Sequence, residues 1–140
     1  MKRVFVILGI LMVTLLSMMA GLSCSEDIKL TAILGSEFTL SVGQTALIEG
    51  EGLTLKFVEV EQDSRCAKGV ECIVAGQVTC KVHVNYKGAT SDISMTQVGG
   101  SLISFGSLGD YNVGFRVEPY PEAGKPIAES EYKLIMKIQK

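Results

Sequence analysis

The sequence has little of what enzymes commonly use. It contains one histidine, His83, and it lacks the G-x-S-x-G motif of serine hydrolases, the H-E-x-x-H motif of zinc proteases and any phosphate-binding loop. His83 falls on the polar side of an alternating segment, and no acidic side chain pairs recognisably with a base. We therefore predict that the protein is not an enzyme and holds no cofactor.

Basic residues are too few for a nucleic-acid surface. Lys and Arg number 13 against 15 Asp and Glu, and no basic cluster interrupts the mixed charge pattern. If Lys2 and Arg3 are removed with a leader, 11 basic residues remain against 15 acidic ones, a net charge of −4. This balance argues against nucleic acid as a partner, and against anionic lipid bound through the folded part.

Metal ligands are also sparse. A zinc site would have to recruit Cys80 from a segment of buried character. The sequence has no Asp-rich calcium loop of the EF-hand kind. We therefore predict no metal site, and we interpret the carboxylates that lie close in sequence as a solvated acidic edge that protects a strand from unwanted pairing. These carboxylates are Glu49, Glu51, Glu59, Glu61 and Asp63.

What the sequence does have is one long apolar run, 4–22, directly after Met1-Lys2-Arg3. A charged start followed by such a run is typical of an export signal. The run ends in Ala20-Gly21-Leu22-Ser23-Cys24, where small side chains suit signal peptidase and Cys24 is placed to become a lipidated first residue. This ending partly resembles the lipobox of bacterial lipoproteins, with Gly21 where such boxes usually have Leu.

Two alternatives to a lipid on Cys24 stay open. Cleavage after Ser23 or Ser25 would release a secreted protein, whereas an uncleaved run of this length just spans a bilayer. In each case we expect an exported protein, either anchored to a membrane on its extracytoplasmic side or secreted. Its predicted partners are the membrane, through the lipid or the uncleaved helix, and another envelope protein.

Apolar and polar residues alternate with period two through most of the remaining chain, which is typical of half-buried β-strands. The clearest such segments are 38–42, 45–49, 53–61, 78–84, 91–95, 111–117 and 132–138. Within 53–61 the apolar set shifts by one residue after Phe57, as a β-bulge produces. Segment 102–109 is either a short edge strand or an ordered loop, and 29–34 is a candidate opening strand.

Turn residues separate these segments. Gly43-Gln44, 49–52 and 86–89 are glycine-containing turns, and Pro119 and Pro121 end a strand before a long loop. About seven short strands without an amphipathic helix predict an all-β fold, a small antiparallel β-sandwich of immunoglobulin-like type after an N-terminal signal or anchor helix. A small barrel is the alternative.

We divide the chain into three parts. Residues 1–23 are predicted to be a signal peptide or membrane anchor, 24–36 a linking segment, and 37–140 a single β-sandwich domain. A chain of 140 residues leaves no room for a second hydrophobic core of ordinary size.

Cysteines of an exported protein meet an oxidising environment, which favours disulfides over metal binding or catalysis. Cys24 belongs to the processing site, and Cys80 lies among valines on the inward face of its strand, where a thiol packs as a small apolar group. Cys66 and Cys72 flank a loop that contains Gly69, and a disulfide between them would contribute about 2 kcal/mol. Pairing of Cys80 with either one is the main competitor.

The run D-S-R-C-A-K-G-V-E-C-I-V-A-G at 63–76 resembles a D-S-R-C-x5-C-x3-G motif of small, uncharacterised exported or lipoprotein-like proteins of bacteria and archaea. The likeness extends to Gly43-Gln44 and to 117–121, so it covers most of the predicted domain. It implies a compact β domain and no catalytic residue. Two positions depart from the pattern, with Ala67 where Pro is expected and Val74 where Trp is expected.

Loops on rigid β scaffolds commonly carry binding function. We therefore predict a non-catalytic binding or interaction module of the cell envelope. Its candidate contact loop consists of Asp63, Arg65, Lys68, Glu71 and Val74. The Asp63 carboxylate is also suited to bond neighbouring backbone N–H groups in a turn. The alternatives are an extracytoplasmic metal-binding or thiol redox protein that uses Cys66 and Cys72, and a protease inhibitor that presents the stapled loop.

Overall fold

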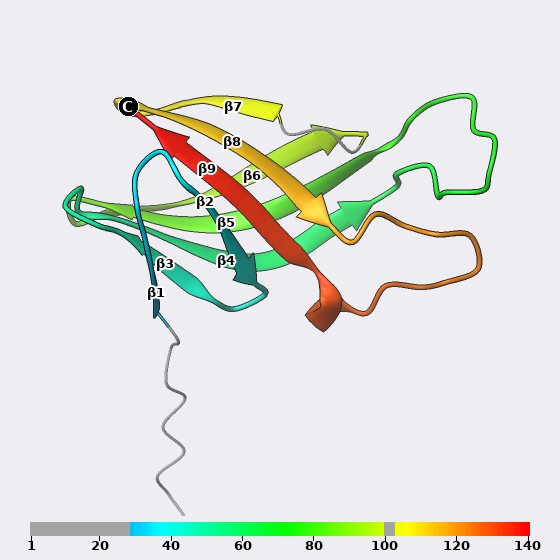
Figure 1. Cartoon of the computed structure of the whole chain (residues 1–140), viewed down its shortest axis with the longest axis horizontal. Helices are drawn as coiled ribbons and strands as arrows, with labels where there is room; N and C mark the ends of the chain where they lie inside the picture. Colours follow the sequence, from blue (N-terminus) through cyan, green and yellow to red (C-terminus); the bar gives the residue numbers. More distant parts are fainter. Residues whose placement is uncertain (1–28, 100–102) are drawn as a thin grey trace, which may run out of the picture.

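The computed structural model describes residues 29–99 and 103–140 (Figure 1). The predicted leader at 1–23 and Cys24, with its predicted lipid, lie outside the described residues, as does the first part of the predicted linking segment. Within the two described ranges, we find no helix with the length and apolar character of a membrane span.

Nine β-strands make up most of the described chain. They are β1 (Lys29–Ala32), β2 (Glu37–Ser41), β3 (Thr45–Ile48), β4 (Leu53–Asp63), β5 (Gln77–Tyr86), β6 (Ala89–Val98), β7 (Ile103–Leu108), β8 (Tyr111–Glu118) and β9 (Lys133–Gln139). One sheet has the order β1-β3-β4-β5-β6 and the other β2-β9-β8-β7. A short 3-10 turn, η1 (Glu129–Glu131), precedes β9.

The predicted antiparallel β-sandwich is confirmed, with nine strands in the described ranges rather than about seven. The additional strands are β1 and β7, which lie in the segments of weak alternation. β1 pairs with β3 in parallel and buries Ala32, so the folded domain includes Lys29–Ala32 and extends N-terminal to the predicted boundary at 37. All other strand pairs are antiparallel.

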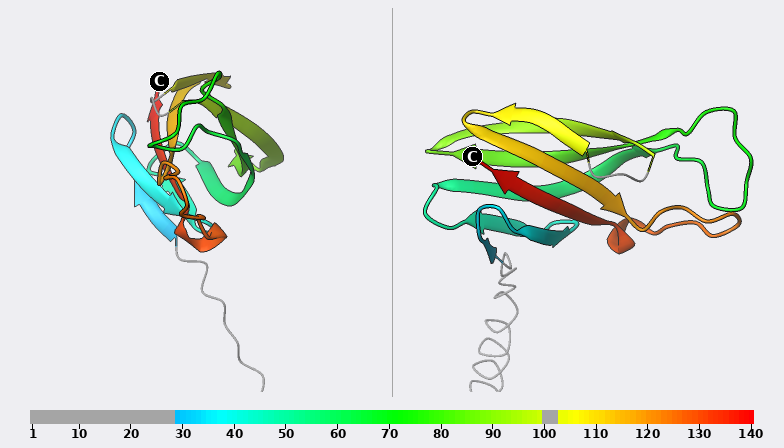
Figure 2. Two further views of the ribbon diagram at one scale, coloured as in Figure 1. Left: turned by 90° about the vertical axis from the view of Figure 1, so that its right-hand side faces the viewer. Right: turned by 45° about the horizontal axis from the view of Figure 1, so that its top comes forward.

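The two sheets face each other (Figure 2). The side chains on their inner faces form one hydrophobic core. As predicted, β5 and β8 contribute alternate side chains to it, among them Val82, Cys80 and Phe115, which are fully buried. Burying a side chain such as Phe115 contributes about 1.5–3 kcal/mol. A polar side chain also packs in this interior: Gln97 of β6 is fully buried, and its Oε1 accepts a hydrogen bond from the Val117 N–H at 2.8 Å.

Two register shifts interrupt the pairing of β4 with β5. The first lies between Phe57 and Glu59, where the sequence predicts a bulge, and the second lies between Val60 and Gln62. Directly opposite residues point to the same face of a sheet. Because the second shift places Asp63 opposite the buried Val78, the carboxylate at the end of β4 is directed toward the interior of the sandwich.

Candidate functional site

Two long loops project side by side from one end of the sandwich (Figures 1 and 2). One is the stapled loop, residues 64–76 between β4 and β5, and the other is the companion loop, residues 119–128 after β8. Backbone hydrogen bonds join them, because the Lys68 N–H donates to Pro121 O at 2.9 Å and the Ala123 N–H donates to Lys68 O at 3.2 Å. The two loops therefore support each other beyond the sheets.

The base of the stapled loop is closed like a short ladder. The Ser64 N–H donates to Gln77 O at 2.7 Å, and the Cys66 N–H donates to Ala75 O at 2.9 Å. Gly76 completes this base with a φ of +66°, and a Cβ added there would lie 1.9 Å from Ser64 O. Only glycine fits this position without displacing the backbone of the opposite arm.

A disulfide joins Cys66 and Cys72 across the loop, with the two Cα atoms 6.0 Å apart. The predicted pair is thus the one that the structure holds, and the competing pairs with Cys80 do not form. Cys80 is a buried free thiol of β5, and burial, with a smaller effect of the Glu61 charge, raises its pKa to about 12. A thiol with this pKa is protonated at neutral pH and is a poor nucleophile.

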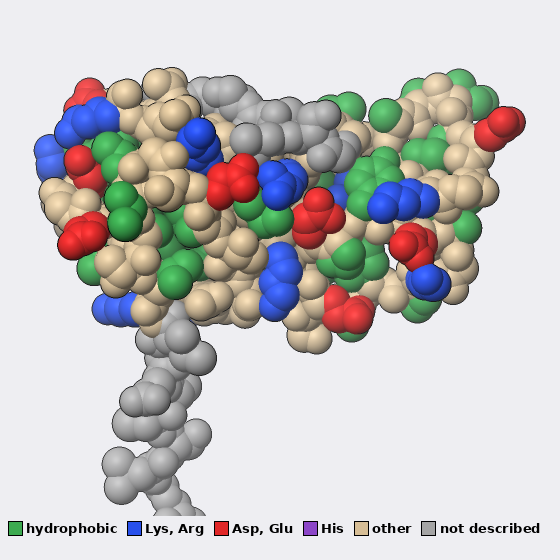
Figure 3. Space-filling model, in the orientation of Figure 1, with side chains coloured by type: hydrophobic (Ala, Val, Ile, Leu, Met, Phe, Trp, Pro, Cys, Tyr) green, Lys and Arg blue, Asp and Glu red, His purple; other side chains and the backbone are tan. Residues whose placement is uncertain are grey.

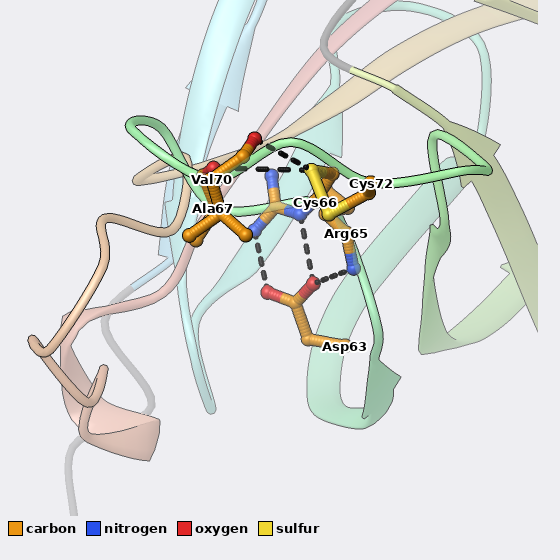
Figure 4. Close-up of a disulfide and its surroundings, with 6 residues drawn as sticks. All are labelled: Asp63, Arg65, Cys66, Ala67, Val70 and Cys72. Carbon is orange, nitrogen blue, oxygen red and sulfur yellow. Dashed lines mark hydrogen bonds and ion pairs between the residues drawn. A yellow bond between two sulfur atoms is a disulfide. The ribbon is translucent and has the colours of Figure 1, made fainter.

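Beneath the disulfide, the Asp63 carboxylate and the Arg65 guanidinium form a bidentate pair (Figure 4). Arg65 Nε donates to Asp63 Oδ1 at 2.9 Å, and Nη2 donates to Oδ2 at 2.6 Å. The backbone N–H of Arg65 also donates to Oδ1, at 3.2 Å, and the Tyr132 hydroxyl donates to Oδ2 at 3.1 Å. We call Asp63 and Arg65, together with the groups of β8 and the companion loop that Arg65 contacts, the clasp.

The remaining Arg65 donors reach across to the other sheet. Nη1 donates to Val117 O at 2.7 Å, and Nη2 donates to Pro119 O at 2.9 Å. The guanidinium also lies 5.1 Å from the ring centre of Tyr120, in a cation–π contact. These hydrogen bonds fasten the start of the stapled loop to the end of β8. Because Arg65 is only 5% exposed, the clasp is closed to an outside ligand.

Arg65 determines the protonation state of the Asp63 carboxyl group. Burial on its own would raise the pKa of Asp63, but the hydrogen bonds and charge of Arg65, with the Tyr132 hydroxyl, outweigh burial and hold that pKa below its ordinary value of 3.8. Burial and the nearby Asp63 charge raise the pKa of Tyr132. At neutral pH the carboxylate is ionised and fully paired, which is the condition for burying a charge.

The stapled loop exposes three large aliphatic side chains. Ile73 is 104% exposed, Val74 72% and Val70 49%. A shallow, open depression of about 780 Å³ lies beside them, between the loop and Tyr120, and Lys68 lies on its border with its Nζ 5.8 Å from the Tyr120 ring centre. Figure 3 shows hydrophobic side chains at the surface of this end of the molecule. We call Val70, Ile73 and Val74 the apolar tip.

The five residues of the predicted contact loop divide into two groups. Lys68, Glu71 and Val74 are exposed on the loop, whereas Asp63 and Arg65 are directed inward and form the clasp. The prediction did not include Ile73, the most exposed large apolar residue of the described chain, although it adjoins Val74 in the sequence. It also missed Tyr120 and Tyr132, which come from a distant segment and join the site only through the fold.

The predicted acidic edge does not gather at one point. Glu59 and Glu61 both contact Lys81, with Nζ–O distances of 2.8 and 3.1 Å, and these carboxylates raise the pKa of Lys81 to about 12. Glu51 lies elsewhere, where it accepts hydrogen bonds from Tyr111 and Lys140. In the part of the chain that the structure describes, no group of three or more ligand side chains is placed to hold a metal ion.

His83 lies on the outer face of the first sheet, where its Nδ1 contacts the Asp92 carboxylate of β6. It is distant in the fold from the stapled loop, since it pairs with Lys56 in the middle of β4.

The arrangement at the loop end thus offers a supported apolar surface. The thiol-redox, metal-binding and protease-inhibitor alternatives stay predictions.

No protein-family model, curated protein or solved structure matches the chain. Function is therefore inferred from the geometry of the loop end.

Proposed function

We propose that the protein is a non-catalytic binding module of the cell envelope and that the apolar tip of the stapled loop is its contact surface. The observation that carries this proposal is the exposure of Ile73 and Val74 on a loop that a disulfide, a companion loop and a buried ion pair all support. Neighbouring exposed apolar side chains on a supported loop are typical of protein–protein contact sites.

Pre-organisation of the loop supports the proposal, because it offsets the small size of the proposed contact surface. A flexible loop loses conformational entropy when it binds, and this loss reduces affinity. The disulfide between Cys66 and Cys72 and the two hydrogen bonds of Lys68 to the companion loop impose that order before binding. Burial of an aliphatic side chain such as Ile73 against a partner then contributes about 1.5–3 kcal/mol, little of which is spent on ordering the backbone.

In this proposal the residues of the predicted contact loop have different roles. Lys68 and Glu71 border the apolar tip and supply charge at the rim of the contact. Exposed charges at a rim change the rate of association more than the affinity. Asp63 and Arg65 hold the loop in place from beneath and do not contact the partner. The D-S-R-C motif would thus be a structural device that positions the tip.

The extracytoplasmic location is part of the same proposal. The disulfide is compatible with an oxidising compartment. The described chain begins at β1, in the half of the molecule away from the two loops (Figure 1). A lipid on Cys24, or an uncleaved leader, would then hold the domain at the membrane and leave the apolar tip free to meet another envelope protein.

A photo-crosslinking amino acid introduced at position 73 tests this proposal in the cells that produce the protein. We expect irradiation to give one discrete adduct of higher mass, and mass spectrometry to identify the attached protein. The substitution Val74→Asp in the same chain should abolish the adduct, because a carboxylate at the tip cannot be desolvated against an apolar partner.

The matched control carries the photo-crosslinker at position 33, since Ile33 is also an exposed aliphatic residue, 63% exposed, but lies between β1 and β2. This variant should give no such adduct. Equal crosslinking from both positions, or none from position 73, would contradict the proposed contact surface.

A further inference from the structure

The first sheet ends in a long edge strand. β6 has ten residues, pairs with β5 along its whole length without a register shift, and is the last strand in the order β1-β3-β4-β5-β6. No strand among the residues that the structure describes pairs with its other side. This free side is the β6 edge.

The turn before β6 determines which backbone groups point to that edge. The chain reverses in a two-residue turn at Lys87 and Gly88, both with positive φ, so Tyr86 and Ala89 form a hydrogen-bonded pair. Because hydrogen-bonded and non-bonded pairs alternate in an antiparallel ladder, the odd-numbered residues of β6 bond to β5. The N–H and C=O groups of the even-numbered residues face outward, and these residues are Thr90, Asp92, Ser94, Thr96 and Val98.

Natural proteins usually protect such an edge with lysine, proline, a bulge or a very short strand. β6 has none of these protections. Its only charged residue is Asp92, which already contacts His83. The side chains of all five outward residues are exposed, and Val98 is 60% exposed. The strand is therefore open to pairing with another extended segment.

We propose that the β6 edge pairs in antiparallel fashion with the β6 edge of a second copy of this chain. A two-fold axis at Ser94 places Ser94 opposite its own copy, Asp92 opposite Thr96 and Thr90 opposite Val98. Every outward N–H and C=O group of the five residues then finds a partner. The two sheets join into one continuous sheet across the dimer.

Strand length and charge together favour this register over the others. With the axis at Ile93 or at Met95, Val98 or Thr90 respectively would lie opposite a residue outside β6, so only four of the five outward residues would pair within the strand. With the axis at Asp92, two carboxylates would lie opposite each other, and like charges in directly opposite positions destabilise a sheet. With the axis at Thr96, Asp92 would extend beyond the paired part of β6 and fewer backbone groups would bond. The register centred on Ser94 thus uses the whole strand and keeps the two Asp92 side chains apart.

Disulfide trapping of the full chain in detergent tests the contact directly. Directly opposite residues in a hydrogen-bonded pair have Cα atoms about 5.5 Å apart, which a disulfide spans. We expect the Ser94→Cys variant to give a disulfide-linked dimer under mild oxidation, on a gel without reductant. The unmodified chain and a Thr39→Cys variant, with its new thiol on exposed Thr39 of β2, should stay unlinked.

Substitutions that change charge test the register. The dimer dissociation constant of each variant is measured by sedimentation of the full chain in detergent. Thr96→Asp places a carboxylate opposite Asp92 twice in the dimer, and should raise the dimer dissociation constant about tenfold. Thr96→Lys places an ammonium there and should not weaken the dimer. Thr39→Asp is the control for an added charge elsewhere, and circular dichroism confirms that each variant folds.

A full chain that sediments as a monomer, or a dimer that responds equally to Thr96→Asp, Thr96→Lys and Thr39→Asp, would overturn the proposal. So would a monomer that instead pairs its β6 edge with the extended strand of a different protein. The result is independent of the apolar tip, which lies on the loops beyond the sheets.

Discussion

Arg65 shows how one side chain can connect two sheets and a loop. Its guanidinium donates to the Asp63 carboxylate, to Val117 O and to Pro119 O, and packs near the ring of Tyr120. Burying a charge is costly unless it is paired and fully hydrogen-bonded, and the clasp meets both conditions. Asp63 and Arg65 therefore have a structural role. In the proposed function they act only by positioning the stapled loop.

Substitution of Arg65 tests this role. Arg65→Met removes the pairing charge and leaves the inward-facing Asp63 carboxylate and two carbonyl groups without their donors. We expect the free energy of unfolding, measured by urea denaturation, to fall by about 3 kcal/mol or more. The matched control is Arg116→Met, because Arg116 forms only peripheral ion pairs, with Glu37 at 3.4 Å and Glu118 at 3.7 Å, and this variant should cost less than about 1 kcal/mol. Equal losses for the two variants would contradict a structural clasp.

The lowered pKa of Asp63 gives a pH dependence with a defined sign. A carboxyl group whose pKa is lower in the folded state binds protons more readily when unfolded, so its contribution to stability is present above its ordinary pKa of 3.8. That contribution is lost as the pH falls through the lower, folded value. Denaturation at a series of pH values should show this loss, and Asp63→Asn should reduce the slope below pH 4. An unchanged slope in Asp63→Asn would assign the acid sensitivity to other carboxylates.

At the scale of elements, β4 determines whether the clasp can form. Its apolar residues reveal the first bulge, because the alternation of Leu53, Leu55 and Phe57 visibly changes phase. The second bulge falls among Glu61 and Gln62, where no apolar residue records a change of phase. The sequence therefore predicts the strand and one bulge, but it does not predict that Asp63 is directed inward.

The other elements show the same limit. The clear alternation in β5 and β8 predicts their buried faces, because burial of apolar side chains determines which face of a strand is inside. Gln97 breaks that pattern on β6, since a buried amide is stable only with a partner, here the Val117 N–H, that comes from another sheet. Contacts of this kind depend on tertiary structure, which period-two patterns do not report.

The base of the stapled loop makes a prediction for Gly76. In Gly76→Ala the new Cβ collides with Ser64 O at a φ that L-residues rarely adopt. Gly69→Ala is the matched control, because Gly69 has a similar φ of +85° but open space around it. We expect Gly69→Ala to cost about 1 kcal/mol, and Gly76→Ala at least ~2 kcal/mol more, in urea denaturation. Similar costs at both positions would show that the collision is relieved cheaply.

At the scale of the whole molecule, alternation and turns predict a two-sheet sandwich, and the cysteines of an exported chain predict the disulfide of Cys66 and Cys72 over pairing with Cys80; both are present. The pairing of the stapled loop with the companion loop was not predicted, because it joins Lys68 to Pro121 and Ala123, far apart in a sequence without periodicity in either segment. The contact role of the predicted loop stays a prediction; of its residues, Asp63 and Arg65 are directed inward, and the exposed Ile73 was not among them.

Pre-organisation of the stapled loop is the property on which the proposed binding surface depends, and NMR relaxation measures it directly. We predict backbone ¹⁵N order parameters for residues 66–72 close to those of the strands, about 0.85, and a fall for these residues in Arg65→Met. Order parameters below about 0.6 for this segment in the unmodified protein would contradict the account, because a loop of that flexibility does not hold its apolar tip ready for a partner.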